Sequence, residues 1–287
     1  MTLGRPLSLP TVDRYELPVQ ATAAQWVGAS SLSVNASITF PASPHTASGW
    51  VEVVSATTDR VTALLVRVEG SNLVSGGNSS TLVDIGVGGA GSETVLIPYL
   101  AAGYHIEGPA REFFVPVVVP VGSRLAVRCQ SARTTGTMNV SLRGMNVPGH
   151  RQPPSAYPTT LAIGVNAAAS RGTVLTAPVP PNTMGAWTEL TASCPQHLAG
   201  LVVQVQGAGH NSLHASGVML DIGVGGAGSE TVIVSNVAYY GNSNEAIDAR
   251  QPVTFAVNIP AGSRIAARWQ RQNANNKIDC HLLGIPA

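Results

Sequence analysis

The sequence has 287 residues, of which 44% are hydrophobic, and this length and composition predict two packed domains. Charged residues make up only 11% and the formal net charge is +1, so the basic field that nucleic-acid binding requires is missing. No run of apolar residues is long enough for a transmembrane helix, so we expect neither a nucleic-acid nor a membrane partner. Residues 1–10 contain no signal-peptide core, so we expect synthesis in a host cytoplasm. The odd number of cysteines, three, fits that compartment.

Residues 1–20 carry Pro6, Pro10 and Pro18 and show no clear periodicity, which predicts an extended N-terminal arm. Two alternatives stay open for it. It is either a frayed terminus or an arm that lies along a neighbouring subunit, for which its scattered leucines are suited.

Residues 21–147 form the first predicted repeat, in which apolar and polar residues alternate with a period of two. Besides runs at 64–69, 124–130 and 137–143, the predicted strands cover 32–40, 49–56, 80–87, 93–98 and 112–119. The positions expected to face inward are Leu64, Val66, Val68, Leu125, Val127, Cys129, Met138, Val140 and Leu142. Those expected to face outward include Leu65, Arg67, Glu69, Arg124, Ala126, Arg128 and Gln130. Short strands separated by Gly, Pro, Ser and Asn indicate a β-sandwich or barrel.

The stretch Asp84–Val95 recurs, identical at all twelve positions, as Asp221–Val232. Chance does not produce such a match, so the chain is a tandem duplication. A proline-rich linker is predicted at 148–158 and the second repeat at 159–287. Counterparts in the two repeats differ by 137 in number up to this stretch and by 140 in the later strands. Trp50 and Trp187 are counterparts, and we expect them to anchor the two cores.

The repeated stretch contains Gly86-Val-Gly88-Gly-Ala-Gly91, which matches the dinucleotide-binding pattern G-x-G-x-x-G. A dinucleotide site requires a helix after the glycines, whereas a β-branched run that ends at Pro98 follows here. We therefore expect a hairpin turn in which Gly88 and Gly89 supply positive φ angles, and a bulge or close approach at Gly86. The predicted turn glycines are Gly86, Gly88, Gly89, Gly91, Gly223, Gly225, Gly226 and Gly228.

Two carboxylates flank each turn, Asp84 and Glu93 in the first copy. We expect Asp84 to accept backbone N–H groups of the glycine turn and Glu93 to pair with Arg124 or Arg128. The alternatives are a glycosidase acid–base pair and a calcium site, for which the sequence offers neither a cleft nor enough oxygen ligands. The predicted structural polar cluster comprises Asp84, Glu93, Arg124, Arg128, Asp221, Glu230, Arg264 and Arg268. No catalytic residue, metal ligand or cofactor is predicted, because the sequence offers no nucleophile with a partnered base.

The two repeats differ most in the loops 100–111 and 237–251. Aromatic and amide side chains there are candidates for contact with a partner protein or a glycan. They are Tyr104, His105, Tyr239, Tyr240, Asn242 and Asn244.

Each repeat combines a D-I-G-V-G-x-A-G-S-E turn with a later P-x-G-S-R-x-A-x-R strand, in a charge-poor chain with a proline-bearing arm. With these features the chain resembles the tandem β-sandwich (jelly-roll-like) structural proteins of tailed bacteriophage virions, such as capsid decoration, head-spike or tail-associated proteins. The resemblance implies an all-β fold of two tandem homologous antiparallel sandwiches. It also implies a non-enzymatic virion subunit whose partners are copies of itself and other virion proteins such as capsid. The alternative function is a glycan-binding module or adhesin that contacts host sugars through the two divergent loops.

Overall fold

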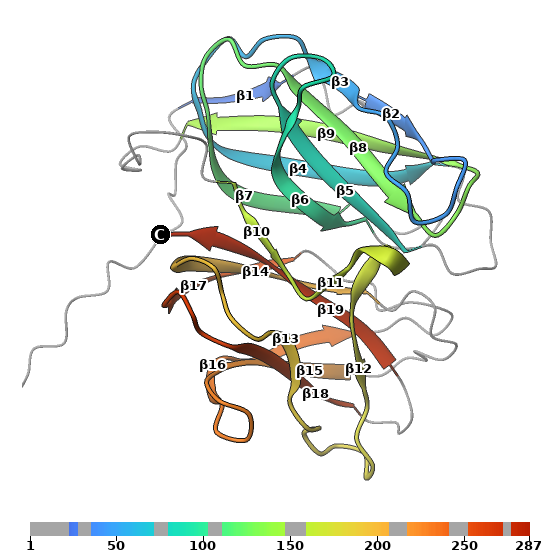
Figure 1. The fold of residues 1–287 in the computed structure, drawn as a ribbon. Coiled ribbons are helices and arrows are strands. Elements are labelled where there is room, and N and C mark those ends of the chain that lie inside the picture. Colours follow the sequence, from blue (N-terminus) through green and yellow to red (C-terminus); the bar gives the residue numbers. More distant parts are fainter. Residues whose placement is uncertain are drawn as a thin grey trace, which may run out of the picture.

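The computed structural model describes residues 23–27, 36–71, 80–102, 111–146, 159–206, 217–240, 252–271 and 277–287. They form two antiparallel β-sandwiches stacked one on the other (Figure 1). The predicted arm at 1–20 and the linker at 148–158 lie outside the described residues. Among the described residues, none of the helices has the length and apolar character that crossing a membrane requires.

The first sandwich consists of two sheets, which we call the β9 sheet and the β5 sheet. The β9 sheet has the order β1-β9-β4-β7, and β2 also pairs with β9. Its strands are β1 (Ala23–Val27), β2 (Ala36–Thr39), β4 (Val61–Ser71), β7 (Arg111–Val119) and β9 (Thr137–Asn146). The β5 sheet has the order β3-β8-β5-β6, with strands β3 (Val51–Val54), β5 (Thr81–Val87), β6 (Thr94–Ala101) and β8 (Leu125–Ser131).

The second sandwich repeats this plan with a β19 sheet and a β15 sheet. The β19 sheet has the order β11-β12-β19-β14-β17, with β10 also on β19. Its strands are β10 (Leu161–Ile163), β11 (Val165–Asn166), β12 (Arg171–Thr176), β14 (Leu198–Gln206), β17 (Val253–Ile259) and β19 (Lys277–Pro286). The β15 sheet has the order β13-β18-β15-β16, with strands β13 (Thr188–Thr191), β15 (Gly217–Val224), β16 (Thr231–Tyr240) and β18 (Ile265–Arg271). The short 3-10 turn η1 (Ala167–Ala169) precedes β12.

The strand orders β2-β9-β4-β7 and β3-β8-β5-β6 place eight strands in two layers of four, as in a jelly roll, and β1 is a further strand on β9. The second sandwich has the same orders among β12 to β19. Every strand pairing in the described residues is antiparallel. The tandem β-sandwich fold that the alternation and the duplication predict is therefore the fold of the chain.

The core of each sandwich lies between its two sheets. The nine inward-facing positions predicted in the first repeat are all buried, with at most 1% of their surface exposed. Cys129, Cys194 and Cys280 are buried and form no disulfide. Burial raises the pKa of Cys129 to about 11 and that of Cys280 to about 12, so both thiols stay protonated and pack as small apolar groups.

Two of the predicted outward positions, Ala126 and Gln130, are buried too. The alternation places them on the outer face of the β5 sheet correctly, but other parts of the chain cover that face. The Gln130 side chain donates from Nε2 to the Ala167 carbonyl oxygen at 2.6 Å. A period-two pattern reports which face a residue occupies and cannot report what packs over that face.

Trp50 and Trp187 are not in the cores, contrary to the sequence-based expectation. Both are half-buried. The Trp50 ring lies so close to Gly86 that a Cβ there would stand 2.7 Å from it, and Trp187 approaches Gly223 in the same way. Since Gly86 is a β5 residue, the close approach expected at this glycine is that of an indole ring packed on the outer face of the sheet.

Candidate functional site

The glycine-rich stretch is the hairpin turn between β5 and β6. Positive φ angles occur at Gly88 (122°) and Gly91 (80°) but not at Gly89, which corrects the expectation of a Gly88–Gly89 pair. The Ser92 N–H donates to the Gly89 carbonyl oxygen at 3.0 Å, so Gly91 is the third residue of a four-residue turn. That position of a type II turn requires a positive φ, which glycine adopts without strain. Gly225 (123°) and Gly228 (82°) repeat this geometry.

One arginine ties each turn to a neighbouring strand. The Arg124 Nη1 atom donates to Glu93 Oε1 at 2.7 Å and to the Gly88 carbonyl oxygen at 3.2 Å. Its Nε atom donates to Glu52 Oε2 on β3 at 2.7 Å. Glu93 therefore pairs with Arg124, one of the two arginines proposed for it.

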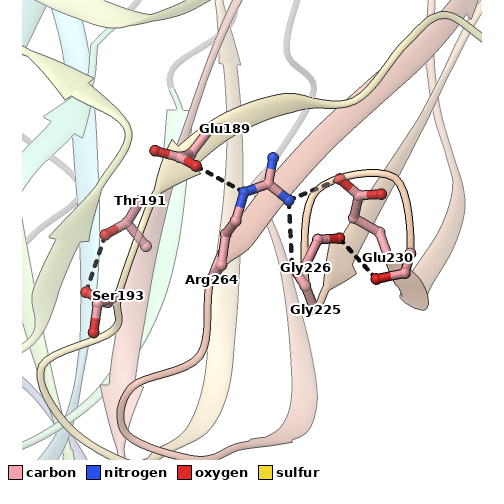
Figure 2. A network of polar contacts seen from close by, with 8 residues as sticks. Glu189, Thr191, Ser193, Gly225, Gly226, Glu230 and Arg264 are labelled. Carbon is pink, nitrogen blue, oxygen red and sulfur yellow. Dashed lines mark hydrogen bonds and ion pairs between the residues drawn. The ribbon is translucent and has the colours of Figure 1, made fainter.

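Figure 2 shows the same network in the second sandwich. There the Arg264 guanidinium lies between Glu189 and Glu230, each at 2.7 Å. It also contacts the Gly225 carbonyl oxygen at 3.3 Å. The Glu230 side chain is 1% exposed, whereas that of Glu189 is 49% exposed. The buried pair therefore fixes the turn, and the exposed carboxylate adds little.

Asp84 has a different role from the one expected. Its Oδ1 atom accepts the N–H of Tyr99 at 2.9 Å, at a register shift of β6 where Tyr99 has a φ of 55°. Its Oδ2 atom accepts from Arg128 Nε at 2.8 Å, and the Arg128 guanidinium lies 4.5 Å from the centre of the Trp50 ring. Asp84 thus caps a bulge in the neighbouring strand and does not bind the glycine turn.

In the second sandwich, Asp221 accepts the N–H of Asn236 at 2.9 Å and a bond from Arg268 Nε at 3.0 Å. Arg268 lies 4.5 Å from the centre of the Trp187 ring. The structure therefore pairs the eight predicted polar residues in the same way in both sandwiches: Glu93 with Arg124 and Asp84 with Arg128 in the first, Glu230 with Arg264 and Asp221 with Arg268 in the second.

These ion pairs hold the backbone of the turns and of the neighbouring strands. Desolvation raises the pKa of the Glu93 carboxyl. The hydrogen bonds from Arg124 and from backbone N–H groups together lower it by more, so the pKa lies below its ordinary value. The pKa of Glu230 is lowered in the same way by Arg264. A general acid would need a raised pKa. Within the described ranges, no group of three His, Cys, Asp or Glu side chains is placed to hold a metal ion.

Most of the candidate contact residues lie outside the described residues, namely Tyr104, His105, Asn242, Asn244 and the side chain of Tyr240. Tyr239 belongs to strand β16 and not to a loop, and it is 5% exposed. Burial raises the pKa of its hydroxyl. Its ring packs in the core of the second sandwich, so it is not the exposed contact residue expected from the sequence.

Polar side chains join the two sandwiches. Gln204 of β14 accepts the N–H of Ala101 at 2.8 Å, and His281 of β19 donates from Nε2 to the Tyr99 carbonyl oxygen at 2.9 Å. The Thr160 N–H donates to the Leu96 carbonyl oxygen at 3.1 Å. Edge strand β6 of the first sandwich is thereby bonded to the outer face of the β19 sheet, and Figure 1 shows these elements adjacent.

A second set of polar contacts involves η1 and the outer face of the β5 sheet. Ser80 Oγ donates to the Ala169 carbonyl oxygen at 3.1 Å, and His45 Nδ1 lies 2.9 Å from Ser170 Oγ. Gln130 also donates to this turn, as described above. The turn that precedes β12 is therefore fixed on the first sandwich.

Aliphatic side chains complete this interface. Val202 and Leu283 belong to the second repeat, are fully buried and form part of the hydrophobic core of the first sandwich, against which Ile285 also packs. Sequence reasoning missed the interface because it assigned one buried face to each strand. A comparison of the two repeats reveals the interface. Leu65 and Arg143 are the counterparts of Val202 and Leu283, so the charged Arg143 on one outer face is replaced by the aliphatic Leu283 on the other.

A surface pocket of about 410 Å³ lies on the second sandwich. It is formed where β15 begins and where β16 and β18 end, next to the divergent segment 237–251. Its lining is Asn182, Gly217, Val218, Met219, Ala238, Tyr239, Gln270 and Arg271. Side-chain amides and apolar groups thus meet in one concave surface.

No family model matches the chain, and no curated protein sequence matches it. Among solved structures, the chain is similar to the N-terminal CBM22-1-CBM22-2 tandem domain of Xyn10C from Paenibacillus barcinonensis. The identity is 10%, 83% of each chain is covered and the TM-score is 0.28. A likeness of this size carries no argument about what the chain binds or does.

Proposed function

We propose that this chain is a non-enzymatic structural subunit of a tailed-bacteriophage virion, which acts by docking on copies of itself and on other virion proteins. The observation that carries the proposal is the contact between the two sandwiches. One outer sheet face, with Val202 and Leu283, completes the core of the neighbouring sandwich. A fold that already joins two sandwiches by burying a sheet face has the means to join further subunits in the same way.

The charged residues support the same proposal. The corner carboxylates are held by Arg124 and Arg264, with lowered pKa values, and serve the fold. The resemblance of the repeat motifs to phage virion proteins supplies the biological setting. Jelly rolls occur in viral capsid proteins and in lectins alike, so the fold by itself does not choose between them.

A second candidate is glycan binding, favoured by the pocket on the second sandwich. Asn182 and Gln270 place side-chain amides there beside Met219, a combination of hydrogen-bonding and apolar groups that suits a sugar. The pocket adjoins the segment 237–251, which the sequence proposes for glycan contact.

Light scattering on the purified full chain, combined with a glycan array, tests the two candidates. The assembly proposal expects a mass above that of one chain, or association with a virion protein encoded nearby, and no sugar bound. A monomer that binds a glycan, and loses it on Gln270→Ala, contradicts the assembly proposal. Portal, protease and tail genes beside this gene are also expected.

A further inference from the structure

The surface by which the first sandwich holds the second is repeated on the second sandwich. His45, Ser80, Leu82, Ala101 and Gln130 of the first repeat correspond in the second to Asn182, Gly217, Met219, Ala238 and Gln270. The backbone follows the same correspondence. His45 and Asn182 have φ angles of 59° and 60°, and their N–H groups donate to the carbonyl oxygens of Ser131 and Arg271 at 2.7 Å in both cases.

On the first sandwich this surface is covered. Leu82 is 1% exposed, and Gln130 donates to the carbonyl oxygen of Ala167 in η1 at 2.6 Å. On the second sandwich all five counterparts line the pocket of about 410 Å³. There Met219 is 42% exposed, and the Gln270 amide nitrogen contacts the Met219 sulfur atom at 3.2 Å. What is an occupied contact in one repeat is therefore a pocket in the other.

The adjoining edge of each sandwich shows the same contrast. Phe113 of β7 is 1% exposed and lies in the hydrophobic cluster that Val202 and Leu283 join, whereas its counterpart Val253 of β17 is 42% exposed. Leu96 of β6 is fully buried, whereas its counterpart Ile233 of β16 is half-buried. Val232 is 38% exposed beside it. At this edge the second sandwich thus exposes aliphatic side chains more than the first one does.

We propose that this open surface is a second docking surface, which binds an aliphatic sheet face of a β-sandwich on another virion protein. The pocket residues Asn182, Gly217, Met219, Ala238 and Gln270 form it together with the β16–β17 edge. Its occupant presents the same kinds of side chain as the outer face of the β19 sheet.

The occupied interface defines that chemistry. Its aliphatic side chains, Val202 and Leu283, fill the edge between the sheets, and a side-chain amide oxygen, that of Gln204, accepts the N–H of Ala101. A carbonyl-bearing turn, as in η1, meets the amide of Gln130. A partner of the open surface therefore presents branched aliphatic residues, an uncharged acceptor for the N–H of Ala238 and a turn carbonyl for Gln270.

A second copy of this chain does not fit that description. Its β19 sheet face is already buried against its own first sandwich. The corresponding face of its β9 sheet carries Arg67 and Arg143 where the β19 sheet has Gln204 and Leu283. A guanidinium cannot accept an N–H, and Arg67 is engaged with Glu69 through an Nε bond of 2.6 Å. Docking this face would bury paired charges against aliphatic side chains, which is unfavourable.

The test places the side chains of the β19 sheet on the outer face of the β9 sheet, in the full chain. In the variant Arg67→Gln with Arg143→Leu, the first sandwich carries the residues of the β19 sheet at these two positions. We expect its sedimentation coefficient to rise with concentration above that of the wild type, because chains then associate through the open surface. Adding Ala238→Arg, which fills that surface, returns the coefficient to the wild-type value. Circular dichroism and a thermal melt establish that each variant is folded.

A folded Arg67→Gln, Arg143→Leu variant that sediments like the wild type at every concentration overturns the inference. Association that survives Ala238→Arg overturns it as well, since another surface then carries it. A wild-type oligomer that dissociates on Ala238→Arg identifies a second copy as the occupant, and a bound glycan lost on that substitution identifies a sugar. Either result replaces the proposed partner.

The inference rests on the proposed docking function, but a separate measurement tests each of them. Light scattering on the wild-type chain tests self-assembly whatever the substituted chain does. The substituted chain tests the open surface whatever the mass of the wild type.

Discussion

His281 makes the stability of the chain depend on pH through the contact between the two sandwiches. Its imidazole is fully buried and donates from Nε2 to the Tyr99 carbonyl oxygen, while Nδ1 has no hydrogen-bond partner among the described residues. Its pKa is lowered from 6.5 to about 4, chiefly by desolvation; the hydrogen bond to Tyr99 raises the pKa and the charge of Arg111 lowers it, both by less. A second proton would have to enter a site without an acceptor.

The direction of the effect follows from this lowered pKa. In the unfolded chain the imidazole takes up a proton as the pH falls through 6.5, whereas in the folded chain it does so only near 4. Its contribution to stability is therefore complete above pH 6.5 and is lost between pH 6.5 and about 4. At about 1.4 kcal/mol per pKa unit, the shift corresponds to roughly 3 kcal/mol.

Urea unfolding of the wild type and of His281→Gln across this pH range measures the contribution. Glutamine retains a donor for the Tyr99 carbonyl oxygen but takes up no proton, and the carboxylates common to both chains cancel in the difference. We expect the difference in unfolding free energy, wild type minus variant, to fall by roughly 3 kcal/mol from above pH 6.5 to about pH 4. A difference that stays constant over this window refutes the burial argument, since His281 would then titrate alike in both states.

Three further predictions concern the corners and the interface. Gly223→Ala places a methyl group against the Trp187 ring and should lower the unfolding free energy by about 1–3 kcal/mol, whereas in a Trp187→Ala background the loss should nearly vanish. Arg264→Ala removes the bond that lowers the pKa of Glu230 below 4.5, so acid unfolding followed by circular dichroism should shift to higher pH; an unchanged midpoint contradicts this role. Gln204→Leu leaves a backbone N–H of β6 without its acceptor, and urea unfolding should show a loss of about 1–3 kcal/mol.

The sequence predicts the strands well because alternation is a local property. Leu64, Val66 and Val68 lie on one face of β4 whatever surrounds it, and all are buried. The repeated stretch also predicts a hairpin, since glycines followed by a β-branched run exclude a helix. These features depend on neighbours in sequence, which a single chain displays directly.

The partners of particular side chains could not be predicted in this way. Asp84 binds the N–H of Tyr99, a contact set by a register shift in β6 that leaves no local pattern. The recurrence of Trp50 as Trp187 in the second repeat predicts a core position, yet Trp50 packs on an outer face under Arg128. Both outcomes depend on which strands pair and on what lies over a glycine, and these are tertiary properties.

The contact between the sandwiches also bears on why the two repeats differ. It joins unlike surfaces, an outer sheet face of one sandwich and the edge and end of the other, so it is heterologous. In a chain of two such repeats, the contact uses the outer sheet face of the second sandwich and the edge and end of the first. The outer sheet face of the first sandwich and the edge of the second take no part in it. The outer sheet face that takes no part in this contact, on β4 and β9, carries Arg67 and Arg143, as the polar outer face of a terminal repeat does. The free edge keeps the aliphatic residues Val232 and Val253 exposed. Growth through this contact between copies of the chain is thereby disfavoured at the first sandwich, while the second retains the apolar surface that we propose as the docking site of a different partner.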